Sequence, residues 1–86
     1  MKAVRLRKSF TKDYNKLSIK NQHAWAACIE QFIEQPWHPK LRRHKLLGKY
    51  EGMDSLDVTF DFRALFVETE DRYNFYFIRN HNQLYS

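Results

Sequence analysis

The stretch FRALFVETEDRYNFYFI, residues 62–78, decides how this chain folds. It holds two runs, residues 62–67 and 73–78, that are apolar except for one arginine and one asparagine, and a short polar segment separates them. Two such runs around a polar turn predict a β-hairpin at the centre of a sheet. Paired about the middle of the turn, the hairpin would put Arg63 opposite Ile78. A one-residue slip would change the face that each side chain occupies, so the register stays open.

The segments outside the hairpin predict two further strands and two helices. Val4 and Leu6 alternate with arginines, which predicts a short edge strand, and residues 55–60 alternate in the same way, which predicts a half-buried strand. The first helix would begin at Ser9 or Thr11, and the second at Ser18. Apolar side chains recur at helical spacing in both, at Phe10, Tyr14 and Leu17 and then at Trp25, Cys28, Ile29, Phe32 and Ile33.

The order of these elements predicts an α+β fold. Two prolines, Pro36 and Pro39, end the second helix by Gln35. The two helices are joined by almost nothing, so we expect them to pack as an antiparallel hairpin. The expected order is β-α-α-β-β-β in a single domain, residues 1–86. The two-helix hairpin would cover one face of an antiparallel sheet and leave the other face open.

Composition narrows the class of protein. The chain has 86 residues and one cysteine, Cys28, so it cannot form an intrachain disulfide, which fits a reducing compartment. We see no apolar run typical of a signal peptide and none long enough to span a membrane. We therefore expect a cytoplasmic protein with no membrane partner. Cys28 lies on the apolar stripe of the second helix and is interpreted as buried packing.

Charge is divided unevenly along the chain. Residues 1–50 hold 12 Lys and Arg against 3 acids, whereas residues 51–86 hold 3 against 7. This asymmetry favours a polyanion partner over a basic face that is merely solvated. The centre of the positive charge is the basic segment, residues 40–49, with Leu46 and Leu47 as its expected apolar anchors and with glycines at 48 and 52 marking a turn. The candidate nucleic-acid-binding residues are Lys40, Arg42, Arg43, Lys45, Lys49 and Arg79.

Three short segments carry side chains that could perform chemistry. They are HKLLG at residues 44–48, DFRALF at residues 61–66 and RNHNQLY at residues 79–85. Each offers an arginine or a histidine, and the expected fold can bring all three to one sheet face. Histidine suits proton transfer because its pKa lies near neutral pH, and the planar fork of arginine suits a phosphate.

Together the three segments resemble the RelE/ParE toxin superfamily, and most closely its YafQ-like and RelE-like ribonucleases. The resemblance covers the whole chain. No single motif is diagnostic, but their order and spacing agree. The matching positions are His44, Leu46, Gly48, Gly52, Asp61, Phe62, Arg63, Phe66, His81, Leu84 and Tyr85.

The resemblance implies a toxin of a type II toxin–antitoxin pair that cleaves messenger RNA in the ribosomal A site. Its reaction is attack by the ribose 2′-hydroxyl on the adjacent phosphate, without metal or cofactor, and its protein partner is an acidic antitoxin. By the same resemblance His44 and His81 are catalytic, Arg63 contacts the scissile phosphate, Asp61 matches a catalytic aspartate, and Tyr85 matches a terminal aromatic that supports stacking or proton transfer. Each of these residues also has an ordinary structural explanation, such as pairing of Arg63 with Asp61 or Asp57.

The chain departs from the family pattern at two positions. Asp57 stands where YafQ-like members carry another histidine, and Asp54 stands where they carry an arginine. The carboxylate that serves YoeB-like members as base would fall near Lys40. The identity of the general base therefore stays open. Two alternatives remain: a ParE-like toxin that binds gyrase without cleaving RNA, and a degenerate member that only binds antitoxin or RNA.

Overall fold

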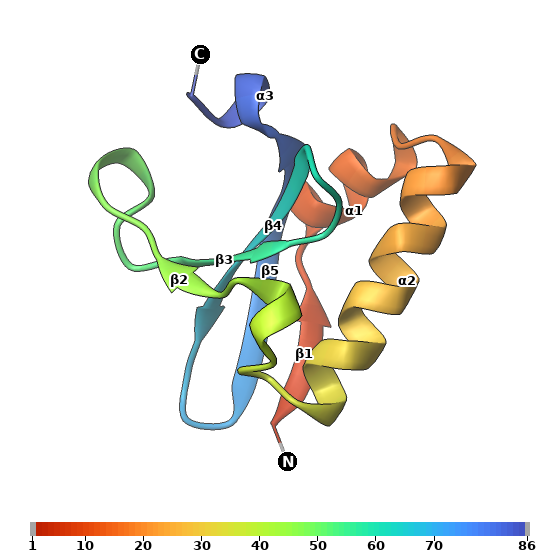
Figure 1. The fold of residues 1–86 in the computed structure, drawn as a ribbon. Coiled ribbons are helices and arrows are strands. Elements are labelled where there is room, and N and C mark those ends of the chain that lie inside the picture. Colours follow the sequence, from red (N-terminus) through yellow and green to blue (C-terminus); the bar gives the residue numbers. More distant parts are fainter. Residues whose placement is uncertain (1, 86) are drawn as a thin grey trace.

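The computed structural model describes residues 2–85 as one five-stranded sheet with helices on it (Figure 1). The strands follow the order β1-β5-β4-β3-β2, so the predicted β4–β5 hairpin lies inside the sheet. In chain order the elements are β1 (Ala3–Leu6), α1 (Lys8–Asn15), α2 (Ile19–Glu34), the 3-10 turn η1 (Pro39–Leu41), β2 (His44–Lys45), the 3-10 turn η2 (Gly48–Tyr50), β3 (Asp54–Asp57), β4 (Phe62–Glu68), β5 (Arg72–Asn80) and α3 (His81–Tyr85). The α+β class is confirmed. None of the helices in residues 2–85 is long and apolar enough to cross a membrane.

The sheet is mixed, which corrects the prediction of an antiparallel sheet. β1 runs parallel to β5, with Val4 opposite Tyr73, whereas the other three strand pairs are antiparallel. The alternation of Val4 and Leu6 predicts a strand and its edge position but carries no information about which strand lies next to it. The two helices that follow β1 carry the chain to β2 at the opposite edge of the sheet, and β1 pairs with the last strand, β5.

A bulge sets the register of the central hairpin. Near the turn the symmetric register holds, with Phe66 opposite Phe75. The register then shifts by one residue, because Tyr76 is extra on β5, and Arg63 lies opposite Arg79 instead of Ile78. Ile78 thereby joins the buried core beneath the helices. An inserted residue of this kind is the definition of a β-bulge, and no turn rule predicts its position.

The main core lies between the sheet and the two long helices. Phe10 of α1 and Phe32 of α2 are fully buried against Phe66 and Phe75, and Trp25 packs edge-on against Phe75 at a centroid distance of 5.2 Å. Tilted and edge-to-face arrangements are the favoured geometries of aromatic pairs. The helices therefore cover one face, as predicted. The Ser18 side chain accepts a hydrogen bond from the amide of Asn21, which confirms Ser18 as the N-cap of α2.

Two local predictions were wrong. α1 begins at Lys8 with Arg7 as its N-cap, so neither Ser9 nor Thr11 caps it. The hydroxyl of Ser9 instead donates to the carbonyl oxygen of Tyr76. β3 ends at Asp57, and the Phe60 side chain, expected in the strand, is 98% exposed in the loop that follows.

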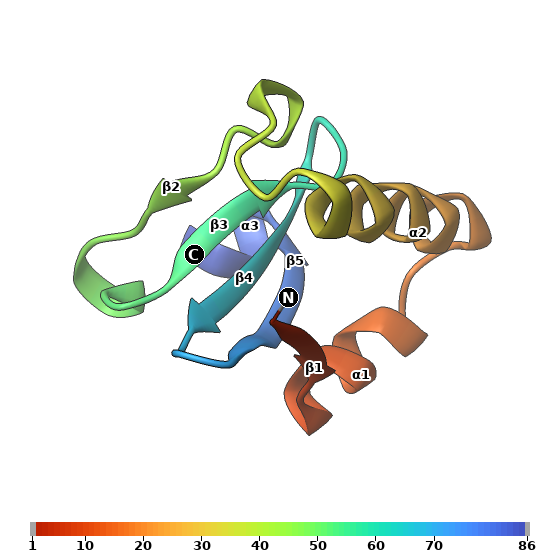
Figure 2. The same ribbon diagram turned by 90° about the horizontal axis from the view of Figure 1, so that it is seen from below.

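The face that was expected to be open is partly covered. A second cluster lies on it, made of Leu46, Tyr50, Leu65 and Leu84 with Met53 and Phe77 at its margin. In Figure 2 the helices α1 and α2 lie to the right of the sheet, and β2 with the loop after it lies to the left. Leu46 anchors the basic segment as predicted, but Leu47 is 83% exposed and does not. Gly48 and Gly52 adopt φ angles of 65° and 93°, which confirms the predicted turn.

Candidate functional site

The candidate site lies on the face of the sheet opposite the two long helices. Opposite residues on neighbouring strands share a face. One row across this face runs from His44 through Ser55 and Leu65 to Phe77, and the next row runs from Asp57 through Arg63 to Arg79. The buried neighbour of Arg63, Ala64, belongs to the helix-covered core. The strand register therefore places His44 and Arg63 on the same face.

Arg63 is held by β3 and by the loop between β3 and β4. Its Nε lies 3.0 Å from Oδ1 of Asp57, and its Nη1 donates to the carbonyl oxygens of Phe60 at 3.1 Å and Thr59 at 3.3 Å. The side chain stays 24% exposed. Within residues 2–85 its Nη2 takes part in none of these bonds, so donors remain for an anion. The partner of Arg63 is thus Asp57 and not Asp61.

Asp61 occupies the exposed end of that loop. Its amide donates to Oγ1 of Thr59 at 3.2 Å, and the amide of Phe62 donates to the same oxygen at 2.9 Å. Hydroxyl-centred turns of this kind fix short loops. The Asp61 carboxylate forms no hydrogen bond or ion pair with the rest of residues 2–85, so it faces solvent close to Arg63 in the chain.

His44 lies on the outermost strand, β2, and is exposed. Its Nδ1 is 2.9 Å from the carbonyl oxygen of Arg42. A protonated Nδ1 donates to that carbonyl, which directs Nε2 to solvent as the nitrogen available for proton exchange. The ring therefore has a defined orientation although its strand is only two residues long.

His81 and Tyr85 lie on α3, which follows β5 directly. Their rings are in contact at a centroid distance of 4.8 Å and are tilted by 46°, and Tyr85 meets Tyr50 edge-on at 6.2 Å. The start of the helix is closed by two reciprocal bonds of 2.8 Å between the backbone amides and side-chain oxygens of Asn80 and Gln83. This is the geometry of a capping box. The exposed His81–Tyr85 pair is therefore carried by an ordered turn of helix.

The second hydrophobic cluster brings the three segments together. Leu46 belongs to the basic segment, Leu65 to β4 and Leu84 to α3, and all three are buried in it. His44, Arg63 and His81 lie two, two and three residues from these leucines, so the three side chains start from segments on the same side of the sheet. Within residues 2–85 no hydrogen bond or ion pair joins these three side chains to one another. The site is an open face, and a substrate would have to bridge them.

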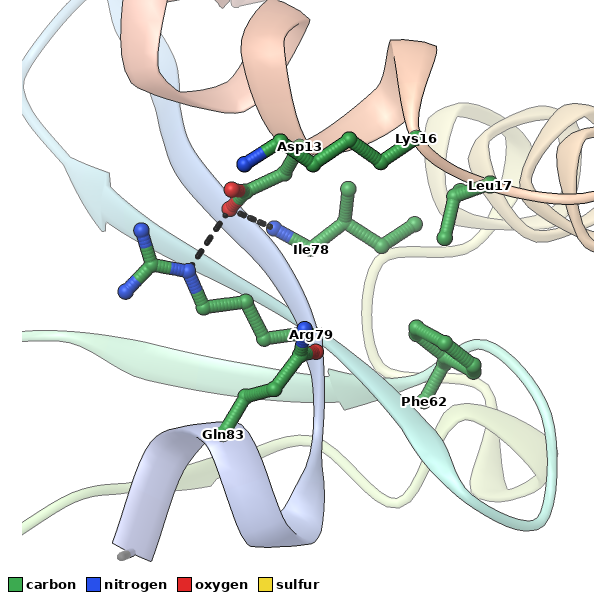
Figure 3. Close-up of a pocket in the computed structure, with 7 residues that line it drawn as sticks. All are labelled: Asp13, Lys16, Leu17, Phe62, Ile78, Arg79 and Gln83. Carbon is green, nitrogen blue, oxygen red and sulfur yellow. Dashed lines mark hydrogen bonds and ion pairs between the residues drawn. The ribbon is translucent and has the colours of Figure 1, made fainter.

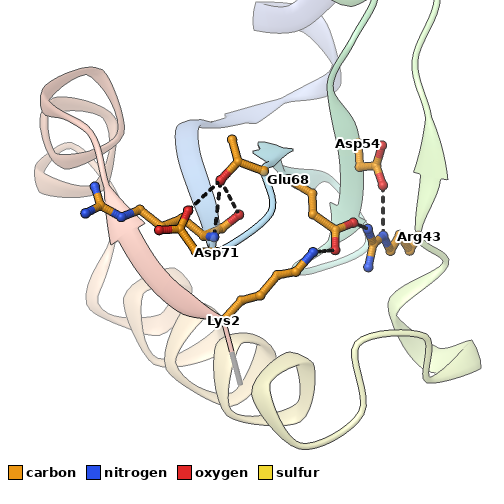
Figure 4. Close-up of polar contacts among 7 residues, drawn as sticks. Lys2, Arg43, Asp54, Glu68 and Asp71 are labelled. Atoms are coloured by element: carbon orange, nitrogen blue, oxygen red, sulfur yellow. Dashed lines mark hydrogen bonds and ion pairs between the residues drawn. The ribbon is translucent and has the colours of Figure 1, made fainter.

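Arg43 was predicted to bind nucleic acid, and its position contradicts that role. Its side chain is only 3% exposed and is paired with Asp54 at 2.8 Å and with Glu68 at 2.7 Å (Figure 4). Its guanidinium carbon also lies 4.0 Å from the ring centre of Trp37 and 4.9 Å from that of Phe66. Cations over aromatic faces are stabilised electrostatically. Arg43 therefore joins the basic segment to the sheet and cannot reach a phosphate.

Glu68 links Arg43 to Lys2 in this network. A hydrogen bond from Lys2, with a further one from Arg43, lowers the pKa of the Glu68 carboxyl below its usual value, although burial acts in the opposite direction. Figure 4 shows the Lys2 and Arg43 side chains approaching this carboxylate from opposite sides. The network thus joins the N-terminal strand, the basic segment and the hairpin.

Arg79 is held at the free edge of β5. β1 pairs with β5 only as far as Phe75, and beyond that point α1 replaces it as the neighbour of the strand. Asp13 of α1 accepts a bond of 3.2 Å from the Ile78 amide and one of 2.9 Å from Nε of Arg79 (Figure 3). A sheet edge left unpaired would otherwise expose these donors. Arg79 keeps a partly exposed side chain, at 32%, beside a pocket of about 320 Å³.

The remaining predicted cations are exposed. Lys40, Arg42, Lys45 and Lys49 all lie on the surface, and Nζ of Lys49 is 5.4 Å from the ring centre of Tyr50. Arg42 adopts a left-handed φ of 49° and its side chain is 77% exposed, with Nε 3.6 Å from Asp57. The basic segment therefore presents four cations to solvent and buries the fifth.

The Cys28 thiol is not a nucleophile in the folded protein. The thiol is buried in the main core and lies 3.7 Å from the carbonyl oxygen of Asp57. Burial, with the nearby charge of Asp57, raises the pKa of the thiol to about 12. The thiol is therefore protonated at neutral pH, and only the thiolate is reactive.

Two residues that matter here were not singled out from the sequence. Asp13 is the only acid in the first 29 residues, and that isolation within a basic stretch was its one visible signal. Phe60 was assigned to a strand, and nothing in its alternation with polar neighbours indicated a loop.

No family model and no curated protein sequence matches this chain. Solved structures do. YafQ from E. coli strain BL21(DE3) superposes with a TM-score of 0.81 at 18% identity over 100% of both chains. A YoeB/ParE toxin from Agrobacterium tumefaciens gives 0.71 at 19% identity over 94% of this chain and 99% of that one. The E. coli DinJ–YafQ toxin–antitoxin complex gives 0.71 at 14% identity over 99% of this chain and 98% of that one.

Identities below 20% in these three comparisons reflect a shared backbone more than a shared site. The agreement nevertheless extends over nearly the whole length of both chains in each comparison. It confirms the expected architecture. The chain has the RelE-like fold of the YafQ and YoeB/ParE toxins.

Proposed function

We propose that this protein is the toxin of a type II toxin–antitoxin pair and acts as a ribosome-dependent endoribonuclease on messenger RNA. One observation carries the proposal: Arg63 lies on the sheet face opposite the two long helices, and the segments that carry His44 and His81 pack on that same face. Support comes from the fold, since the similar structures include a YoeB/ParE toxin and a toxin–antitoxin complex.

The chemistry needs a cation for the phosphate and groups that move protons. In the proposed reaction the ribose 2′-oxygen attacks its own phosphorus, the bond to the 5′-oxygen breaks, and a 2′,3′-cyclic phosphate remains. Arg63 donates to the non-bridging oxygens, which gain charge in the transition state. A histidine base removes the 2′-hydroxyl proton and a histidine acid protonates the leaving oxygen. The residues proposed for these steps are His44 and His81, with Tyr85 and Asp61 beside them.

Asp57 is a poor general base in this arrangement. Its carboxylate is already shared by Arg63 at 3.0 Å and Arg42 at 3.6 Å. Each of its two oxygens faces a guanidinium group, so neither is directed at a substrate hydroxyl. The base is therefore assigned to one of the histidines. His44 is favoured because its Nδ1 contact with the Arg42 carbonyl leaves Nε2 free to accept the proton.

The exposed cations provide the proposed binding surface for RNA in the ribosomal A site. They are Lys40, Arg42, Lys45 and Lys49 of the basic segment, with Arg79 at the neighbouring strand edge. An acidic antitoxin would cover the same surface in the inactive complex, because disordered segments that fold on binding can wrap a large surface and acidic ones complement its charge. Both partners belong to the cytoplasm, and neither a metal nor a cofactor is required.

The test is to map messenger RNA ends after the protein is induced, with translation active and with initiation blocked. Cleavage within translated frames that disappears when ribosomes are blocked is the expected result. Cleavage of naked RNA at the same positions would remove the ribosome from the proposal. Intact transcripts together with inhibited gyrase would move the protein to the ParE-like class.

A further inference from the structure

A groove lies beside the candidate site, between α2, η1 and the loop that joins β3 to β4. It encloses about 720 Å³, a volume typical of small-ligand pockets. Its floor is apolar, formed by Ala24, Ala27 and Cys28 of α2 together with Leu41 and Val58. Gln31 is the amide side chain that lines it. None of these residues has a part in the chemistry proposed above.

Phe60 stands at the mouth of this groove. Its side chain is 98% exposed, the largest exposure among the large hydrophobic residues of the described chain. The loop that carries it is nevertheless fixed, because Arg63 donates to the Phe60 carbonyl at 3.1 Å and Thr59 accepts the Phe62 amide at 2.9 Å. A rigid loop thus holds a flat aromatic ring with both faces free. A single exposed hydrophobic side chain is common on protein surfaces, and what distinguishes Phe60 is that it borders a groove lined by cations.

The groove is positively charged. Lys40, Arg42 and Arg63 line it, against the single carboxylate of Asp57. The Arg42 side chain is 77% exposed, so it can leave Asp57 for another anion at little cost. An aromatic ring beside a cationic channel is the arrangement that binds single-stranded nucleic acid, because bases stack on the ring while phosphates meet the cations.

We propose that this groove binds one nucleotide of single-stranded RNA that flanks the scissile bond. The base stacks on Phe60, its phosphate is bound by Arg42 and Lys40, and the Gln31 amide meets the base edge. Arg63 connects this groove to the reacting phosphate, since it holds the Phe60 loop and also faces the candidate site. The inference rests on the proposed function and adds to it a residue that binds the nucleotide beside the cut.

The test measures binding of a short fluorescein-labelled single-stranded RNA to the purified protein by fluorescence anisotropy. Phe60→Ala should weaken binding about 5- to 150-fold, the range expected for the loss of one stacked base. Phe60→Tyr should restore it, because the ring remains. Ile19→Ala is the matched control, since Ile19 is also an exposed apolar side chain, 70% exposed, but lies outside the groove.

A second series locates the base. One abasic nucleotide is placed at each position of the RNA in turn. For the unmodified protein one position should lose affinity, and for Phe60→Ala that loss should vanish, because the base and the ring act through the same contact. Equal losses for both proteins at every position would overturn the proposal. Unchanged RNA affinity in Phe60→Ala with weaker binding of an acidic peptide would overturn it too and make the groove a protein-docking surface.

The groove proposal and the proposed function can be refuted separately. If the protein cleaves translated transcripts and Phe60→Ala does so with the same KM and the same preference at the cut, the groove proposal fails alone. If the protein binds RNA through Phe60 but cleaves no transcript, the proposed function fails and the groove stands. Failure of the unmodified protein to bind the labelled RNA overturns the groove proposal.

Discussion

Arg63 on β4 lies directly opposite Arg79 on β5, yet the two guanidinium groups pair toward opposite sides of the hairpin. Arg63 binds Asp57 on β3 at 3.0 Å, and Arg79 binds Asp13 on α1 at 2.9 Å. Like charges directly opposite in a sheet repel, and this arrangement relieves the repulsion. Both side chains remain partly exposed, so one sheet face presents two oriented arginines to an anion.

The first prediction concerns Arg63. Arg63→Ala should lower the rate of transcript cleavage by on the order of 10²–10³-fold, because a preorganised donor to the developing negative charge is lost. Arg63→Lys should recover only part of it, since an ammonium lacks the planar fork. The free energy of unfolding in urea should fall by about 1 kcal/mol in the alanine variant, because the hydrogen bonds of the Arg63 side chain are partly exposed. Full cleavage by Arg63→Ala would refute the catalytic assignment.

The second prediction concerns His81. His81→Ala should reduce cleavage by on the order of 10²–10⁴-fold, the usual contribution of one proton-transfer group. Its pH–rate profile should lose one limb that the unmodified protein shows. Asn82→Ala is the control, because Asn82 is exposed on the same helix and outside the proposed chemistry. A variant with normal rate and an unchanged profile would show that His81 transfers no proton.

The third prediction separates two adjacent arginines. Arg43→Met should reduce the free energy of unfolding by about 3 kcal/mol, because it leaves Asp54 without its buried partner. Arg42→Met should cost less than about 1 kcal/mol, since Arg42 is mostly exposed. RNA binding should show the opposite contrast. Arg42→Met should weaken binding more than Arg43→Met does and should reduce its dependence on salt. Chemical denaturation measures the stability of each variant, and fluorescence anisotropy at several salt concentrations measures its RNA binding. Equal losses of stability in the two variants would contradict the prediction.

The fourth prediction concerns pH. The folded-state pKa of Glu68 is lowered by Lys2 and Arg43, so its ionised form stabilises the protein above the unfolded carboxyl pKa. That contribution is lost as the pH falls through the lowered folded value. Glu68→Gln should therefore lower Tm near neutral pH, and the difference from the unmodified protein should close in acid. Thermal unfolding by circular dichroism across the acidic range measures it; a constant difference at every pH would argue against the network.

The fifth prediction concerns Cys28. With a pKa of about 12 and little exposure, the thiol should react with iodoacetamide at neutral pH far more slowly in the native protein than in urea. Mass spectrometry of timed samples follows the reaction. Rapid labelling under native conditions would mean that α2 opens readily.

Much of the fold could be predicted because it depends on local patterns. The apolar runs on either side of the polar turn indicate the β4–β5 hairpin, because a short turn lets two adjacent strands pair antiparallel. The spacing of Trp25, Cys28 and Phe32 specifies the buried face of α2, and Ser18 specifies its start. These features rest on chain geometry and on the hydrophobic effect, which act within one segment.

The positions that matter for function depended on contacts between distant segments. Nothing in the sequence distinguishes Arg43 from its neighbour Arg42. Arg43 is buried because Asp54 and Glu68 of the sheet pair with it, whereas Arg42 stays exposed. The bulge at Tyr76 puts Arg63 opposite Arg79 and leaves Ile78 in the buried core, and no pattern within β5 indicates its position. The sequence determined the elements and the total charge by itself. Tertiary structure decided which cations face solvent, because a charge is buried only where oppositely charged groups from other elements compensate its lost hydration.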